Sequence, residues 1–162
     1  PSLILFQTAN SKAKDNVATS TIALSLSEQL YATPFVDLGT DDPSNCVDSD
    51  GKVDHGTAGS LCEEAPLNSM GRSETEGVGK QLFPYKRYSV ICDDSKSLIG
   101  GYTGDKCAIP NSNFANGPVP DELACDSADY TSNSKGIKVL VAYYDRDGSC
   151  KTTSLENFKI GS

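Results

Sequence analysis

The chain has 162 residues, a formal net charge of −8 and a 37% share of hydrophobic residues. This length suits one compact domain, and the 14 glycines and 8 prolines favour short strands joined by long turns over a helical bundle. The negative charge repels phosphate backbones and anionic lipid surfaces, and no stretch approaches the roughly 20 apolar residues that span a bilayer. We therefore expect neither a nucleic-acid partner nor a membrane span.

The first two predicted elements are strands. Leu3 to Thr8 is a short apolar run, and Thr19 to Ser27 alternates small or polar residues with aliphatic ones. A period of two is typical of a half-buried strand, and β-branched residues at the start of the second segment favour it. A helix over about 21–30 is the alternative, since Leu26 and Leu30 lie four residues apart.

A long acidic loop is predicted over about residues 37–64. It carries eight acidic residues against Lys52 alone, with Gly, Pro and Asn between them. Cys46 and Cys62 lie near its ends and are expected to close it. His55, the only histidine of the chain, falls in this loop and is expected to be solvated.

Three aspartates in this loop resemble part of a calcium-binding loop. Asp48 and Asp50 fall at the second and third ligand positions of such a loop, and Asp54 falls at the position that binds the cation through a water molecule. This pattern can surround a hard cation with oxygen atoms. The first and last ligand positions, however, fall on Cys46 and Thr57, which cannot complete the set. We therefore expect an exposed turn, keep the three aspartates as the metal candidates, and predict no cofactor.

The next strand is predicted within Leu82 to Cys92, with Pro84 at its edge or start. It contains Tyr85-Lys86-Arg87-Tyr88, the one basic and aromatic cluster of an acidic protein. Tyr and Arg anchor many protein interfaces, so Tyr85, Lys86 and Arg87 are candidate partner contacts. The alternative is an ordinary amphipathic strand.

The last third of the chain is predicted to be a loop followed by a hairpin. Asp93 to Ser134 is rich in Gly and Pro, whereas Gly136 to Asp145 alternates strongly, and Cys150 to Ile160 can return beside it after an Asp-Arg-Asp-Gly turn. Tyr143 and Tyr144 must point to opposite faces of the strand. One ring should be core; Tyr144 joins the candidate contacts as the exposed one.

Six cysteines without a C-x-x-C pair predict three disulfides rather than a zinc site: Cys46, Cys62, Cys92, Cys107, Cys125 and Cys150. By position we expect Cys46–Cys62, Cys107–Cys125 and Cys92–Cys150, although six cysteines allow fifteen pairings. Such bridges persist outside the cytosol, so an extracellular location is expected. The start at Pro1, without an initiator Met, suggests a processed secreted protein.

The predicted fold is a single domain over 1–162, mainly β, as a disulfide-stabilised barrel or sandwich, or α+β with one short helix. Its expected core is Ile4, Phe6, Ile22, Leu24, Leu26, Val90, Val139, Val141 and Tyr143.

The processed start, spaced cysteines, sequence pI near 4.5, absence of N-glycosylation sequons and polar loops resemble the small secreted effector and toxin proteins of filamentous fungi. The resemblance is one of composition over the whole chain, so it transfers no functional residue. It implies a monomeric virulence protein that binds a host protein and is not an enzyme. The alternatives are a small secreted hydrolase that uses a carboxylate pair and a carbohydrate- or cell-wall-binding module.

Overall fold

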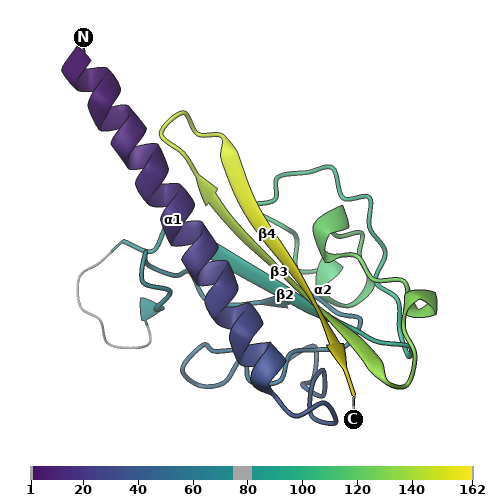
Figure 1. Cartoon of the computed structure of the whole chain (residues 1–162). Helices are drawn as coiled ribbons and strands as arrows, with labels where there is room; N and C mark the ends of the chain where they lie inside the picture. The colour runs from purple at the N-terminus through teal and green to yellow at the C-terminus, as the bar shows by residue number, and fades with distance from the viewer. Residues whose placement is uncertain (1, 75–81, 162) are drawn as a thin grey trace.

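The computed structural model describes the backbone of residues 2–74 and 82–161 and the side chains from Asn16 onward. One long helix, α1 (Ser2–Ala32), runs along a face of a four-stranded antiparallel sheet of order β1-β2-β3-β4 (Figure 1). The strands are β1 (Cys62–Glu63), β2 (Lys86–Cys92), β3 (Ser134–Tyr144) and β4 (Cys150–Ile160). Three short helices, α2 (Asn113–Asn116), η2 (Asp121–Leu123) and η3 (Ser127–Asp129), lie in the segment between β2 and β3.

The β-rich, disulfide-stabilised architecture is confirmed, but the barrel or sandwich is not found. Within the described residues the sheet is open, with β1 at one edge and β4 at the other. Its two faces are covered by different layers: α1 on one, and the 93–133 segment on the other. That the whole chain forms a single domain stays a prediction.

The prediction of two N-terminal strands was wrong, because both segments belong to α1. The buried residues of α1 recur every three or four positions, as the face of a helix requires: Ala18, Thr19, Ile22, Ala23, Leu26, Ser27 and Leu30. Leu24, which a strand would turn inward, is 49% exposed. Ile4 and Phe6 lie outside the residues whose side chains are described.

Two apolar clusters form the core, one on each face of the sheet. The first packs Ile22, Leu26 and Leu30 of α1 against alternate residues of β2 and β3, including Ile91 and Val139. The second lies under the 93–133 segment and contains Tyr88, Val90, Leu98, Val119, Leu123 and Leu140. Ile22, Leu26, Val90, Val139, Val141 and Tyr143 are buried as predicted.

The predicted C-terminal hairpin is confirmed. β3 and β4 pair along their whole lengths, from Ser134 opposite Ile160 to Tyr144 opposite Cys150. The turn is closed by the Asp145 amide, which donates to the Ser149 carbonyl at 2.9 Å. This hairpin supplies the two strands on which α1 rests.

Two lysines of this hairpin hold the C-terminal end of α1. Lys135 Nζ donates to the carbonyls of Phe35 and Leu38 at 2.7 and 2.9 Å, just after the helix. Lys159 Nζ donates to the carbonyls of Tyr31 and Thr33. Cations stabilise a helix C-terminus, where carbonyl groups lack partners within the helix.

The structure contains three disulfides, of which Cys46–Cys62 is the predicted one. The other two predicted pairings were wrong, since the bonds are Cys92–Cys125 and Cys107–Cys150. The reason is that Cys125 pairs with Leu98 in a β-bridge beneath the end of β2, which brings it to Cys92. Three disulfides suit an oxidising extracellular setting, while secretion itself stays a prediction.

Candidate functional site

Helix α1 extends beyond the rest of the molecule. At about 1.5 Å per residue, its 31 residues make a helix of roughly 46 Å. Its contacts with the sheet involve β3 and β4, and among the residues with described side chains the buried positions run from Ala18 to Leu30. Figure 1 shows the N-terminal turns of α1 projecting past the β3–β4 turn. The helix therefore has a docked C-terminal half and a projecting N-terminal half.

The docked half is fixed by polar contacts as well as by the core. Arg87 reaches the helix from β2 and donates from Nη1 to the Ile22 carbonyl at 2.9 Å. The same guanidinium donates from Nη2 to Glu64 Oε1 at 2.6 Å and from Nε to Glu64 Oε2. Thr153 Oγ1 of β4 donates to Thr19 Oγ1 at 3.0 Å. These bonds fix the orientation of α1 about its own axis, and so determine which of its side chains face the sheet.

That orientation leaves a stripe of apolar side chains facing solvent. Val17, Leu24 and Tyr31 are 67%, 49% and 47% exposed, and they follow one another at intervals of seven residues. Seven residues are close to two helical turns, so the three positions lie in one row along the helix. We call Val17, Leu24 and Tyr31 the outer seam.

A seam with this spacing is typical of helix-to-helix contacts. Apolar residues repeating at about 3.5 or 7 positions let neighbouring helices pack side by side. Position 3, a leucine, falls two further heptads upstream in the same register as Val17. Sequence reasoning missed the seam because the spacing has meaning only once residues 2–32 form a helix.

The amino-acid sequence of the projecting half gives it little helix-forming strength of its own. Helices shorter than about 12–15 residues are marginal alone, and residues 7–16 include Thr, Asn and Ser, which are weak helix formers. The first turn reads Leu3-Ile4-Leu5-Phe6, four consecutive apolar residues, and such a run leaves no polar side to a helix. A partner that packs against this half would stabilise it.

The sequence-predicted contact cluster is mostly internal. Tyr85 and Arg87 are buried, Tyr85 with its ring 5.5 Å from the Tyr143 ring, so neither presents a surface to a partner. Lys86 is partly exposed and forms an ion pair with Glu63. Burial removes Tyr85 and Arg87 from the set of accessible residues, and a contact role for Lys86 stays a prediction.

Tyr144 is exposed, and Tyr143 is buried, as the alternation predicted. The Tyr144 hydroxyl donates to Asp105 Oδ2, and this bond raises the pKa of the tyrosine above its usual value. Tyr144 is the last residue of β3, two positions beyond Ala142, which pairs with Lys86, so these two candidate contacts lie near each other at this end of the sheet. A binding role for Tyr144 also stays a prediction.

The three calcium candidates form a turn rather than a cage. Asp48 Oδ1 accepts from the amides of Asp50 and Lys52, both at 2.9 Å, and the Gly51 amide donates to the Asp48 carbonyl. The carboxylate of Asp48 is thus engaged by its own loop. Within the described residues, Asp48, Asp50 and Asp54 are not among any three ligand groups that come within 4.8 Å of one another.

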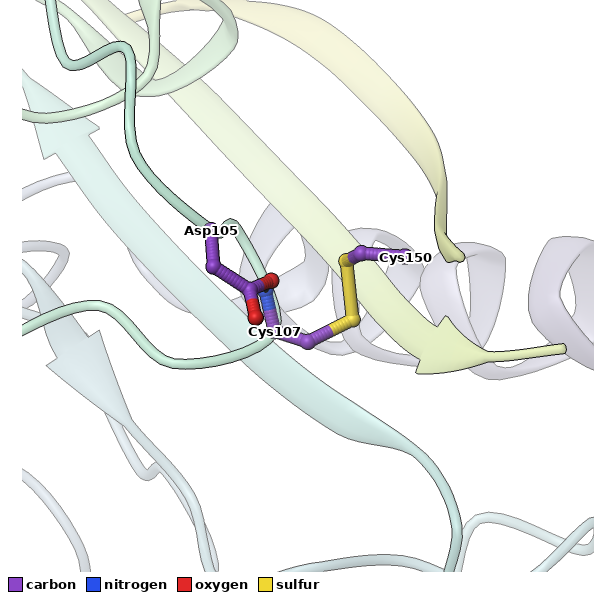
Figure 2. Close-up of side chains that lie close together, drawn as sticks. All are labelled: Asp105, Cys107 and Cys150. Carbon is purple, nitrogen blue, oxygen red and sulfur yellow. Dashed lines mark hydrogen bonds between the residues drawn. A yellow bond between two sulfur atoms is a disulfide. The ribbon is translucent and has the colours of Figure 1, made fainter. Parts of the chain in front are cut away.

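One such group does occur in the described part of the chain, formed by Asp105, Cys107 and Cys150 (Figure 2). The two sulfur atoms are bonded to each other, so they offer no thiolate to a metal. Asp105 Oδ1 accepts from the Cys107 amide at 2.9 Å. The arrangement fastens the 93–133 segment to the start of β4.

Comparison with known proteins does not assign the chain to a family. A scan against protein-family models matched none, and searches of curated proteins and of solved structures found no match. Among the described residues, no helix is both long and apolar enough to cross a membrane.

Proposed function

We propose that this protein is a structural subunit that assembles with further copies of itself through α1 and displays its disulfide-bonded head on the outside. The observation that carries the proposal is the outer seam of Val17, Leu24 and Tyr31, exposed on a helix whose N-terminal half projects from the domain. Packing of α1 helices against one another would cover the seam and support the projecting half.

The distribution of charge supports copies of the same chain as the partner. Residues 2–32 carry Lys12 and Lys14 against Asp15 and Glu28, so their net charge is zero, and the whole −8 resides in the remainder. Like-charged heads repel one another, whereas neutral helices can approach closely. Copies should therefore meet through their helices, with the heads turned outward.

This proposal keeps the protein-binding, non-enzymatic class expected from the sequence and changes the partner. It replaces a monomer that binds a host protein with a self-associating subunit. The effector, hydrolase and carbohydrate-binding hypotheses stay predictions.

Sedimentation velocity on the oxidised full chain tests the proposal, over a concentration series from about 5 µM to 1 mM. We expect self-association to a discrete species, with a simultaneous gain of helical circular dichroism. Leu24→Ser removes a seam side chain that is already exposed, so the monomer should remain folded. Its association should weaken about tenfold, the equivalent of about 1.4 kcal/mol for one lost apolar contact.

Leu82→Ser is the matched control, because Leu82 is also an exposed leucine but lies outside α1. It should associate like the parent protein. A chain that remains monomeric throughout the series would overturn the proposal. Equal weakening by both substitutions would show general apolar adhesion in place of a helix seam.

A further inference from the structure

A second surface lies on the face of the sheet opposite α1. It is an open groove of about 720 Å³, with a wall formed by residues 97–100 and 124–130 and a floor that includes Lys138 of β3 with Glu156 and Phe158 of β4. Nothing in the self-association of α1 uses this groove.

The groove combines exposed apolar surface with uncompensated negative charge. Phe158 is 52% exposed and stacks on Tyr130, with ring centroids 6.1 Å apart. Asp126, Asp129 and Glu156 line the same space, and within the described residues none of the three belongs to an ion pair.

The one lysine of the groove does not neutralise these carboxylates. Lys138 lies directly opposite Glu156 in the β3–β4 register, yet its Nζ donates to the Ala124 carbonyl at 2.5 Å. It therefore holds the wall of the groove to the sheet. Among the described residues that line the groove, three carboxylates and one engaged ammonium group give a net charge of −2.

The carboxylates of the groove affect the pKa of Tyr130, one of the two stacked rings. Burial raises the pKa of the Tyr130 hydroxyl, and the charges of Glu156 and then Asp129 raise it further. The same field favours a cation placed beside the Tyr130 and Phe158 rings, where an aromatic face adds its own attraction.

The groove opens beside an unpaired sheet edge. β4 is the terminal strand, and among the described residues its backbone pairs only with β3. Such an edge can accept a further strand, in which main-chain bonds give affinity and pockets for alternate side chains give specificity.

We propose that β4 and this groove form a docking site for an extended segment of a partner protein, which pairs with β4 and places a Lys or Arg side chain in the groove. The aliphatic stem of that side chain would lie on Phe158, and its charged end would reach Asp126, Asp129 and Glu156. The chemistry that recognises the segment is thus a cation on an apolar stem, presented by a β-strand.

The test uses the acetylated and amidated peptide Thr-Val-Lys-Val-Thr as the probe, titrated into the oxidised full chain by calorimetry and by amide NMR shifts. The peptide with Glu in place of Lys controls for strand pairing without the cation. We expect saturable binding of the lysine probe, with shifts centred on β4 and residues 124–130, and at least about tenfold weaker binding of the Glu probe.

Two charge variants separate the groove from the overall acidity of the protein. Asp129→Asn with Glu156→Gln removes two charges from the groove, whereas Asp94→Asn with Glu28→Gln removes two exposed charges elsewhere. The groove variant should bind the lysine probe at least about fivefold more weakly, and the control variant should stay within about twofold of the parent.

Strand pairing is tested by N-methylation of the probe at alternate amides. One of the two methylated probes should lose binding about tenfold and the other should keep it, because only one set of amides can face β4. The proposal would be overturned if the lysine probe shows no saturable binding up to about 1 mM, or if the Glu probe binds equally well. It would also be overturned if the two charge variants have equal effects, or if neither set of N-methyl groups changes the binding.

Discussion

Replacement of Glu64 by Gln should destabilise the fold strongly, because it leaves a buried guanidinium without its counter-charge. Glu64 is 2% exposed and Arg87 7%, and two nitrogens of Arg87 donate to the two carboxylate oxygens of Glu64. Breaking a buried pair by removing one partner costs about 3–5 kcal/mol. A small domain has only about 5–15 kcal/mol in total, so the loss should be conspicuous.

The neighbouring residues provide a matched control. Glu63 and Lys86 form the adjacent ion pair between β1 and β2, but their side chains are 18% and 33% exposed. Water screens such a pair, and Glu63→Gln should cost less than about 1 kcal/mol. The assay is urea unfolding of the oxidised protein at pH 7, followed by far-ultraviolet circular dichroism.

A double-mutant cycle completes this test. Glu64→Leu and Arg87→Met should each be costly alone, while the double variant should recover most of the loss, since apolar groups can replace a buried ion pair. If Glu64→Gln costs no more than Glu63→Gln, or if the two single losses add in the double variant, the stabilising role of the buried Glu64–Arg87 ion pair is refuted.

Three further outcomes are expected. Leu30→Ala should lose about 2–5 kcal/mol in urea unfolding, whereas Leu24→Ala should lose less than about 0.5 kcal/mol, and equal losses would contradict the orientation of α1. Gly56 has φ +73° and a Cβ there would overlap a β2 side chain, so Gly56→Ala should lower stability by about 1–3 kcal/mol; an unchanged midpoint would count against this packing. The hydrogen bond from Lys106 lowers the pKa of Glu122 below its ordinary 4.5, so this pair stabilises the fold above that pH and the effect is lost as pH falls through the folded-state pKa. Lys106→Met should therefore reduce stability by up to about 1 kcal/mol at pH 7 and match the parent in strong acid, and a loss that persists in acid would disprove the assignment.

The strands that could be predicted from sequence are those whose alternation has a single interpretation. Residues 136–145 alternate large apolar residues over a long run, and they form most of β3. The α1 segment failed because its buried face uses Thr19, Ala23 and Ser27, which hydropathy counts as small or polar. Small residues on that face let the helix approach the sheet closely, and their burial is a tertiary effect that local alternation does not reveal.

The candidate contacts show the same limit. The Tyr85-Lys86-Arg87-Tyr88 cluster was a candidate contact because it is basic in an acidic chain, with an ordinary amphipathic strand as the alternative. Its arginine is buried against the carboxylate of Glu64, the residue that follows β1, and no pattern in the sequence pairs these two residues in advance. The disulfides failed in part for a similar reason, since nearness along the chain favoured Cys107–Cys125 over the pairings that the sheet brings together.

Amide hydrogen exchange of residues 5–16, measured at low and at high protein concentration, tests most directly whether the projecting half of α1 is an assembly element. At about 5 µM, where copies are separate, these amides should exchange nearly as fast as in an unfolded peptide, because a lone helix of this length is marginal. At about 1 mM they should become protected in parent protein and in Leu82→Ser, and much less so in Leu24→Ser. Protection that is the same at both concentrations, or that Leu24→Ser leaves unchanged, would contradict assembly through α1.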